Sequence, residues 1–298
     1  MTREYPVFVP SGEERIAAVI AVPEGTPRGL VLMLPGGGGA PRSQRYGMYT
    51  KVARSLAERG IASVRMEWRG IGESTGQARY SFKALPVEDS VTVARFALRA
   101  TGATQFGMAA NCGGARTALL ALPGVPEARA AVLMMLKPRS ITRSQKPPVK
   151  RMKRWVKRIP WAGALIRQAY WAVRGWRKGT PVYDGLRVLN GMSDLLLLEA
   201  GTVKVGKLSR FVANLQAKNG SHRLEMRTLP GGASRSFQSL ERQDFVIESV
   251  VEWFDQLFPV MQDIPAHESS HSSHGQPVPP RKPRKTVLAS EAEPTATG

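Results

Sequence analysis

The sequence predicts an α/β fold with a mostly parallel central sheet and helices on both faces of the sheet. One pattern, repeated in two parts of the chain, supports this prediction. Short apolar runs of strand length alternate with segments of helical period through residues 1–136 and again through residues 189–260, which is the order of repeated βαβ units. The stretch between them, residues 137–188, breaks the alternation and is expected to form a helical lid inserted into one core domain. Residues 261–298 are rich in Pro, Ser and His and are expected to be disordered.

Turn residues and hydrophobic period set the boundaries of the expected elements. Residues 1–25 have the alternating pattern of strands. Further strands are expected at 29–34, 61–68, 105–111, 130–136, 194–201 and 223–229. Helices are expected at 46–59, 89–99, 207–217 and 242–258, and two more in the insertion, separated near Pro160. Asp89 is predicted to be the N-cap of the second of these helices.

The composition limits the class of protein. One cysteine in 298 residues excludes an intramolecular disulfide and favours a reducing compartment. The N-terminus shows no charged segment leading into an apolar run, and no apolar stretch approaches the roughly 20 residues of a membrane span. A soluble, cytoplasmic protein is therefore expected, and no metal or cofactor is expected.

The single cysteine lies in a motif that is typical of a nucleophile. Cys112 follows a predicted strand and precedes a helical run, within the sequence "ANCGG" (residues 110–114). A sharp strand-to-helix turn needs small residues on both sides, because larger side chains would collide. The start of the helix would stabilise a thiolate, and the N–H of Gly113 with an N–H from the Gly36 and Gly37 turn would form an oxyanion hole. The alternative is that Cys112 is simply a small buried residue.

The order of segments before this motif resembles the α/β-hydrolase family. The stretch "VLMLPGGGGAPRSQRYGMYTKVARSLAERGIASVRMEWRGIGESTGQ" (residues 31–77) has the order strand, glycine-rich loop, helix, strand and R-G-x-G-x-S. More narrowly, the chain is similar to hydrolases associated with exosortase systems in bacterial exopolysaccharide loci. Those hydrolases carry a cysteine at the same strand-to-helix turn, which is called the nucleophile elbow. The resemblance covers about Tyr5 to Phe258. It implies an α/β-hydrolase fold, Cys112 as nucleophile and a small acyl or glycan ligand.

The other two members of the family's triad are not matched. The resemblance places the acid at residues 201–203, which hold no carboxylate, so Glu199 is the one candidate for a substitute base. It places the histidine base where this chain has Arg235. Arginine stays protonated, so Arg235 could stabilise a thiolate but could not activate water. His222 is expected at the far end of its strand, roughly 20 Å from the site.

The insertion carries most of the excess positive charge. Between Lys137 and Lys178 there are fourteen basic residues and no acidic one, in a chain of formal charge +20, and four of the six tryptophans lie there too. A solvated helix usually mixes charges of both signs, so we expect this segment to contact an anionic membrane surface or an anionic polysaccharide. The alternative is a lid whose tryptophans pack on the core and whose charges are merely solvated. The residues expected to make the contact are Lys150, Arg151, Lys153, Arg154, Trp155, Lys157 and Arg158.

Three functions remain open at this stage. The first is a hydrolase-like protein with an incomplete triad that binds an acyl or glycan ligand, peripheral to the inner face of a membrane. The second is a working thiol-dependent ester, thioester or amide hydrolase that uses Cys112 with an unconventional base. The third is binding of nucleic acid or another polyanion, ranked last because no segment resembles a nucleic-acid-binding module. His267, His271 and His274 could ligate a metal but are expected to be solvated.

Overall fold

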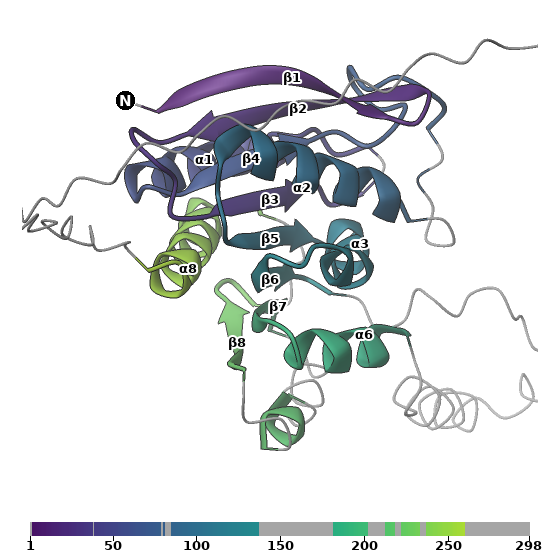
Figure 1. The fold of residues 1–298 in the computed structure, drawn as a ribbon. Coiled ribbons are helices and arrows are strands. Elements are labelled where there is room, and N and C mark those ends of the chain that lie inside the picture. Colours follow the sequence, from purple (N-terminus) through teal and green to yellow (C-terminus); the bar gives the residue numbers. More distant parts are fainter. Residues whose placement is uncertain are drawn as a thin grey trace, which may run out of the picture. The chain divides into compact units, whose positions relative to one another are not determined.

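A computed structural model of the chain describes residues 2–37, 39–78, 80, 85–136, 181–201, 212–217, 222–232 and 237–259 (Figure 1). The chain divides into two units, Met1–Met261 and Gln262–Gly298, and every described residue belongs to the first. The predicted disordered tail, the predicted insertion up to residue 180 and Arg235 lie outside the described residues.

The described residues form one eight-stranded sheet with the strand order β1-β2-β4-β3-β5-β6-β7-β8. The strands are β1 Arg3–Ser11, β2 Glu14–Val22, β3 Leu30–Leu34, β4 Ala62–Met66, β5 Phe106–Asn111, β6 Ala128–Met134, β7 Asp194–Ala200 and β8 Leu224–Leu229. Strand β2 pairs antiparallel with β1 and with β4, and the remaining pairs are parallel. The predicted α/β fold with a mostly parallel sheet is therefore confirmed.

Helices cover both faces of this sheet (Figure 1). They are α1 Met48–Glu58, α2 Val87–Thr101, α3 Gly113–Ala121, α6 Pro181–Asn190 and α8 Leu240–Leu257, with short 3-10 turns η1 Arg45–Gly47 and η2 Leu122–Gly124. Helix α1 packs against α8 on one face, while α3 packs against both α2 and α6 on the other. The core accordingly has two apolar layers, one on each side of the sheet.

The central strands are uniformly apolar because both of their faces are covered. Every residue of β3 is buried. In β7, Leu195 and Leu197 belong to the apolar layer under α2 and α3, whereas Leu196 and Leu198 belong to the layer under α1 and α8. The strict alternation of side chains along a strand explains this division. It also places the next residue, Glu199, on the same face as Leu197.

The prediction that Asp89 is a helix N-cap is wrong. Helix α2 begins two residues earlier, and Pro86 holds the N-cap position. The buried Asp89 carboxylate instead accepts hydrogen bonds from Ser11 Oγ (2.7 Å) and Arg69 Nη2 (2.5 Å). The sequence pattern of a cap was present, but tertiary partners from β1 and from the loop after β4 use the side chain.

The predicted insertion ends in an element of the core. Helix α6 covers residues 181–190, and its Leu186 and Leu189 are buried in the apolar layer that also holds Leu119 of α3. The last eight residues of the range 137–188 thus belong to a helix packed on the sheet.

In the described part of the chain, no helix combines the length and the apolar character needed to cross a membrane.

Candidate active site

The candidate nucleophile stands at the junction of β5 and α3. Strand β5 ends at Asn111 and helix α3 begins at Gly113, so Cys112 alone makes the turn. Its backbone has φ 50° and ψ −103°, a conformation that L-residues rarely adopt. A strained residue of this kind persists only where the surrounding structure holds it, and such residues cluster at functional sites. The partly exposed Cys112 therefore occupies the sharp turn that the sequence predicted.

Close approach of the backbone explains the small residues around the turn. A Cβ atom on Gly114 would lie 2.6 Å from the Pro35 carbonyl oxygen, and one on Gly113 would lie 1.8 Å from the Tyr80 hydroxyl. Ala110, on the other side of the cysteine, is fully buried. These distances support the prediction that small residues are needed directly after the turn.

The glycine-rich loop after β3 reaches the turn at Cys112. It presents the Gly36 carbonyl, and not an N–H group, to Gly113. The N–H of Gly113 donates a hydrogen bond to the carbonyl oxygen of Gly36 at 2.9 Å, and the N–H of Cys112 donates to that of Met134 at 2.8 Å. The predicted oxyanion residues Gly36, Gly37 and Gly113 are thus brought together. In this conformation the Gly113 N–H is occupied by the protein itself and is not available to an oxyanion.

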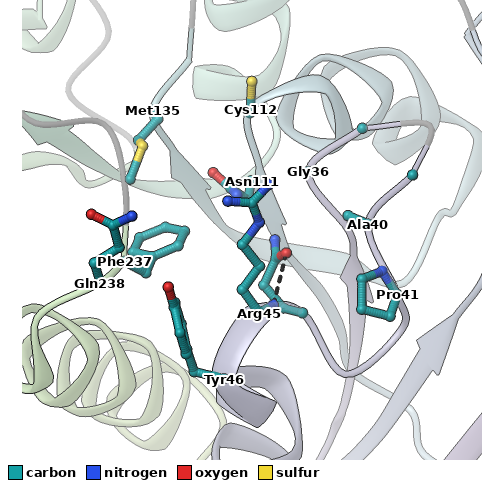
Figure 2. A pocket seen from close by; sticks show the side chains of 13 residues that line it. Gly36, Ala40, Pro41, Arg45, Tyr46, Asn111, Cys112, Met135, Phe237 and Gln238 are labelled. Carbon is teal, nitrogen blue, oxygen red and sulfur yellow. Dashed lines mark hydrogen bonds between the residues drawn. The ribbon is translucent and has the colours of Figure 1, made fainter.

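A cavity of about 460 Å³ opens beside the turn (Figure 2). Its size is that of a small-molecule site. The residues that line it are Gly36, Gly37, Gly39, Ala40, Pro41, Gln44, Arg45, Tyr46, Asn111, Cys112, Met135, Phe237 and Gln238. None of them is a histidine, aspartate, glutamate or lysine, so this lining offers no side chain that could serve as a conventional general base.

Backbone strain in the described residues is concentrated at this cavity. The non-glycine residues with positive φ in the described part are Gln44 (56°), Tyr46 (61°), Cys112 (50°) and Met135 (50°). All four line the cavity. They come from the loop before α1 and from the ends of the neighbouring strands β5 and β6. Since strain of this kind usually costs about 1–3 kcal/mol per residue and gathers at functional sites, the cavity is the candidate active site.

Two polar side chains near Cys112 were not predicted from the sequence. Arg116 lies on α3 four residues after Cys112 and is only 1% exposed. Burial lowers the pKa of Arg116, while negative charge on Tyr80 or Cys112 acts in the opposite direction. Burial, and then a charged Cys112, raise the pKa of Tyr80 to about 12, so its hydroxyl is a neutral hydrogen-bond donor at neutral pH. A buried cation and a phenol therefore lie next to the candidate nucleophile.

The short sequence separation of Arg116 from Cys112 could have indicated that the two lie close together. The position of Tyr80 in the sequence could not. Cys112 is the N-cap of α3 and Arg116 is the fourth residue of that helix, so the cation lies within about one helical turn of the nucleophile along the chain. Tyr80 comes from the turn-rich segment after β4, and its ring packs on Trp68 at a centroid distance of 5.4 Å. Only the tertiary fold brings it to the elbow.

Among the described residues, Glu199 and His222 are not at the cavity. Glu199 is buried at the end of β7, 3% exposed, and is not among the lining residues. His222 precedes β8 and lies 3.6 Å from Asp194, which is the first residue of β7. It is therefore at the opposite end of the sheet from Cys112, as expected. Arg235 and the seven basic-segment residues from Lys150 to Arg158 lie outside the described residues.

No group of three or more potential metal ligands occurs within the described ranges. The tail histidines fall outside those ranges.

Comparisons with known proteins agree with the fold. A family model described as the alpha/beta hydrolase fold matches residues 29–169. A dienelactone hydrolase from Anabaena variabilis is 16% identical and has a TM-score of 0.55, with 86% of this chain and 98% of that chain covered. An esterase from Pyrococcus furiosus is 16% identical with a TM-score of 0.58, covering 86% and 92%. A carboxyl esterase from Bacillus coagulans, solved with glycerol, is 13% identical with a TM-score of 0.56, covering 87% and 99%. A search of curated protein sequences found no match.

Proposed function

Because this chain has the α/β-hydrolase fold, we propose that it binds an acyl compound in the cavity beside Cys112 and captures the acyl group on the thiol without efficient hydrolysis. One observation carries the proposal. The strained backbone positions of the described chain, Cys112 among them, all surround one cavity, which is the usual sign of a preserved functional site. The same lining lacks the groups that would complete a hydrolase.

The first chemical step needs only the thiolate. Its sulfur attacks the carbonyl carbon, a C–S bond forms, and the bond from that carbon to the leaving group breaks, so the leaving group departs with the electron pair. Arg116 is buried near Cys112, and its positive charge interacts favourably with a charged Cys112. Capture of an acyl group is thus supported by residues that the structure describes.

The second step, release of the acyl group by water, lacks a base. The sequence has no histidine between His222 and His267, and His222 lies at the other end of the sheet beside Asp194. General acid–base assistance typically contributes about 10²–10⁴-fold to a rate. The Gly113 N–H, bound to the Gly36 carbonyl, adds no oxyanion stabilisation to either step in this conformation, so the missing base is what makes release slower than capture. The acyl-thioester at Cys112 is therefore expected to persist.

The proposal is tested with p-nitrophenyl acetate. We expect a burst of p-nitrophenolate of about one equivalent per chain, followed by a phase at least ~100-fold slower, with one acetyl group found on Cys112 by mass spectrometry. Cys112→Ala should give neither burst nor adduct. Steady turnover without an accumulated adduct would instead identify the protein as a working thiol hydrolase, and an unmodified Cys112 after the incubation would exclude acyl capture.

Cys112→Ser provides a sharper test for a hidden base. A serine hydroxyl is not nucleophilic without a general base, whereas a thiolate is. We therefore expect Cys112→Ser to be inert toward the ester. An acetyl group found on the introduced serine would show that a base reaches the site, and the proposal of an incomplete triad would then be abandoned in favour of the hydrolase.

We further propose that the protein acts beside an anionic surface, in exopolysaccharide production. The support is the resemblance to exosortase-associated hydrolases and the fourteen basic residues without an acid between Lys137 and Lys178. Each cation near an anionic membrane contributes about 1 kcal/mol. The support comes from sequence alone, since residues 137–180 lie outside the described ranges.

Vesicle co-sedimentation tests this part of the proposal. Vesicles with phosphatidylglycerol should retain the protein at low salt, and neutral phosphatidylcholine vesicles should not. Changing Lys150, Arg151, Lys153 and Arg154 to glutamine should abolish retention. The matched control changes Arg281, Lys282, Arg284 and Lys285 of the tail, which removes the same charge and should leave retention intact. Equal loss in both variants, or equal retention on neutral vesicles, would refute a specific role of the insertion.

A further inference from the structure

We infer that the acyl compound bound beside Cys112 carries a carboxylate group and that Arg45 binds this carboxylate. The inference rests on the proposed function, because it names the substrate class of the same cavity. It is argued from charge, backbone geometry and an unmatched polar atom, none of which depends on the chemistry of the thiol.

Arg45 is an exposed residue that lines the cavity, and its positive charge has no counterion among the described residues. It is the one charged side chain among the described lining residues, and no hydrogen bond or ion pair joins its guanidinium to another described residue. Arg42, three residues earlier in the same loop, is different. Its Nη1 lies 2.9 Å from Glu67 Oε2 and 2.7 Å from Glu73 Oε2, so its charge is neutralised. Arg42 is therefore held by protein carboxylates, whereas Arg45 lines the cavity without a described protein partner.

The backbone on both sides of Arg45 is strained in a way that fixes its position. Gln44 has φ 56° and Tyr46 has φ 61°. Gln44 is buried, and its side-chain oxygen accepts the Arg45 N–H at 3.1 Å. Figure 2 shows the Arg45 side chain extending from this turn into the cavity toward Asn111. A local conformation that is unfavourable by itself thus presents a cation at the cavity that Cys112 also lines.

Asn111 contributes a second, independent sign of a ligand. Its side chain is 8% exposed and lines the cavity, and its Oδ1 has no hydrogen-bond partner among the described residues. A buried acceptor without a partner is unfavourable, and an O–H or N–H group of a ligand would satisfy it. Met135 and Phe237 form an apolar part of the lining that suits a short carbon chain. The ligand that fits is a hydroxy- or amido-acyl compound with an anionic end.

A carboxylate fits this site better than a phosphate does. The guanidinium fork matches the two oxygens of a carboxylate in one plane. A single cation balances one negative charge, whereas a phosphate monoester brings nearly two at neutral pH, and the described lining has no second cation to meet it.

Alkylation of Cys112 by matched reagents tests the inference independently of acyl transfer. Iodoacetate and iodoacetamide differ in charge but hardly in size, and maleimidopropionic acid and N-ethylmaleimide form a longer pair. We expect Arg45→Gln to lower the ratio of anionic to neutral rate constants by about fivefold in at least one pair. Lys51→Gln is the matched control, because Lys51 is exposed on α1 and does not line the cavity. It should leave both ratios unchanged.

Two results would overturn the inference: unchanged ratios in Arg45→Gln, or an equal decrease in Lys51→Gln. Thermal melting with added ligand gives a second readout that needs no reactive thiol. Glutarate and glucuronate should raise the melting temperature of the wild-type protein but not of Arg45→Gln, and the uncharged glutaramide should raise neither. Stabilisation by inorganic phosphate alone would also contradict the assignment to a carboxylate. If carboxylates bind but no acyl-thioester forms, the inference stands and the proposed acyl capture fails.

Discussion

Gly114→Ala is expected to destabilise the protein although it places a better helix-forming residue inside α3. In an unconstrained helix the change would stabilise by about 1 kcal/mol. Here the new Cβ would lie 2.6 Å from the Pro35 carbonyl oxygen and 2.7 Å from that of Leu34. Both contacts are with backbone, which cannot rotate away as a side chain can. Overpacking of this kind typically costs about 1–3 kcal/mol or more, so the net change should be a loss of about 2 kcal/mol.

Thermal or urea unfolding measures this effect, and Gly185→Ala is the matched control. Gly185 lies inside α6, and a Cβ there would meet Leu119 at 3.5 Å, which is ordinary van der Waals contact. The control should therefore gain up to ~1 kcal/mol from helix propensity. Opposite signs for the two substitutions are the expected result. If both variants gained stability, α3 would not approach β3 as closely as the structure has it. The close packing at the Cys112 turn would then be contradicted.

The same contact links stability to the geometry of the site. Helix α3 begins against the last residues of β3, and the loop that follows β3 supplies Gly36, whose carbonyl binds the Gly113 N–H. A substitution that pushes α3 away from β3 would move both partners of that hydrogen bond. The small residues of the turn therefore fix the relative position of the thiol and the glycine loop, not only the path of the chain.

The elbow could be predicted because its requirements are local. Small residues on both sides of Cys112, a strand before it and a helical run after it all lie within residues 105–122. The orientation of the Gly36 peptide could not be predicted in this way. Glycines accept many backbone conformations, so a run of four of them specifies a flexible loop but leaves open whether an N–H or a carbonyl faces the nucleophile.

The partners of charged side chains could not be predicted from the local sequence either. Asp89 has the sequence pattern of a helix cap, yet it binds Ser11 and Arg69, which come from distant segments. Arg45 lies in a loop whose other arginine, Arg42, is held in ion pairs with Glu67 and Glu73. Nothing in the local sequence distinguishes the two arginines. Only the packing of the loop after β4 against the loop after β3 decides which cation remains free for a ligand.

Arg116→Met should slow the alkylation of Cys112 by iodoacetamide at neutral pH by about tenfold. Arg116 is buried at 1% exposure on the first turns of α3, and its charge interacts with that of Cys112. A charge pair inside the protein is screened far less than one in water. Methionine preserves most of the length and apolar contact of the arginine side chain but removes the positive charge. The charged form of Cys112 then loses its interaction with a nearby cation.

A melting curve and a charge-preserving variant separate this effect from simple damage to the fold. The melting temperature of Arg116→Met should stay near that of the wild type while its alkylation rate falls. Arg116→Lys keeps the charge and should keep the wild-type rate. A large drop in the melting temperature of Arg116→Met would indicate a damaged fold, and an unchanged alkylation rate would contradict the role of Arg116. With the cation confirmed, the site would be one in which a buried charge supports the nucleophile, while its described lining offers no group that activates water. This asymmetry between the two steps is what makes a retained acyl group the expected state of the loaded protein.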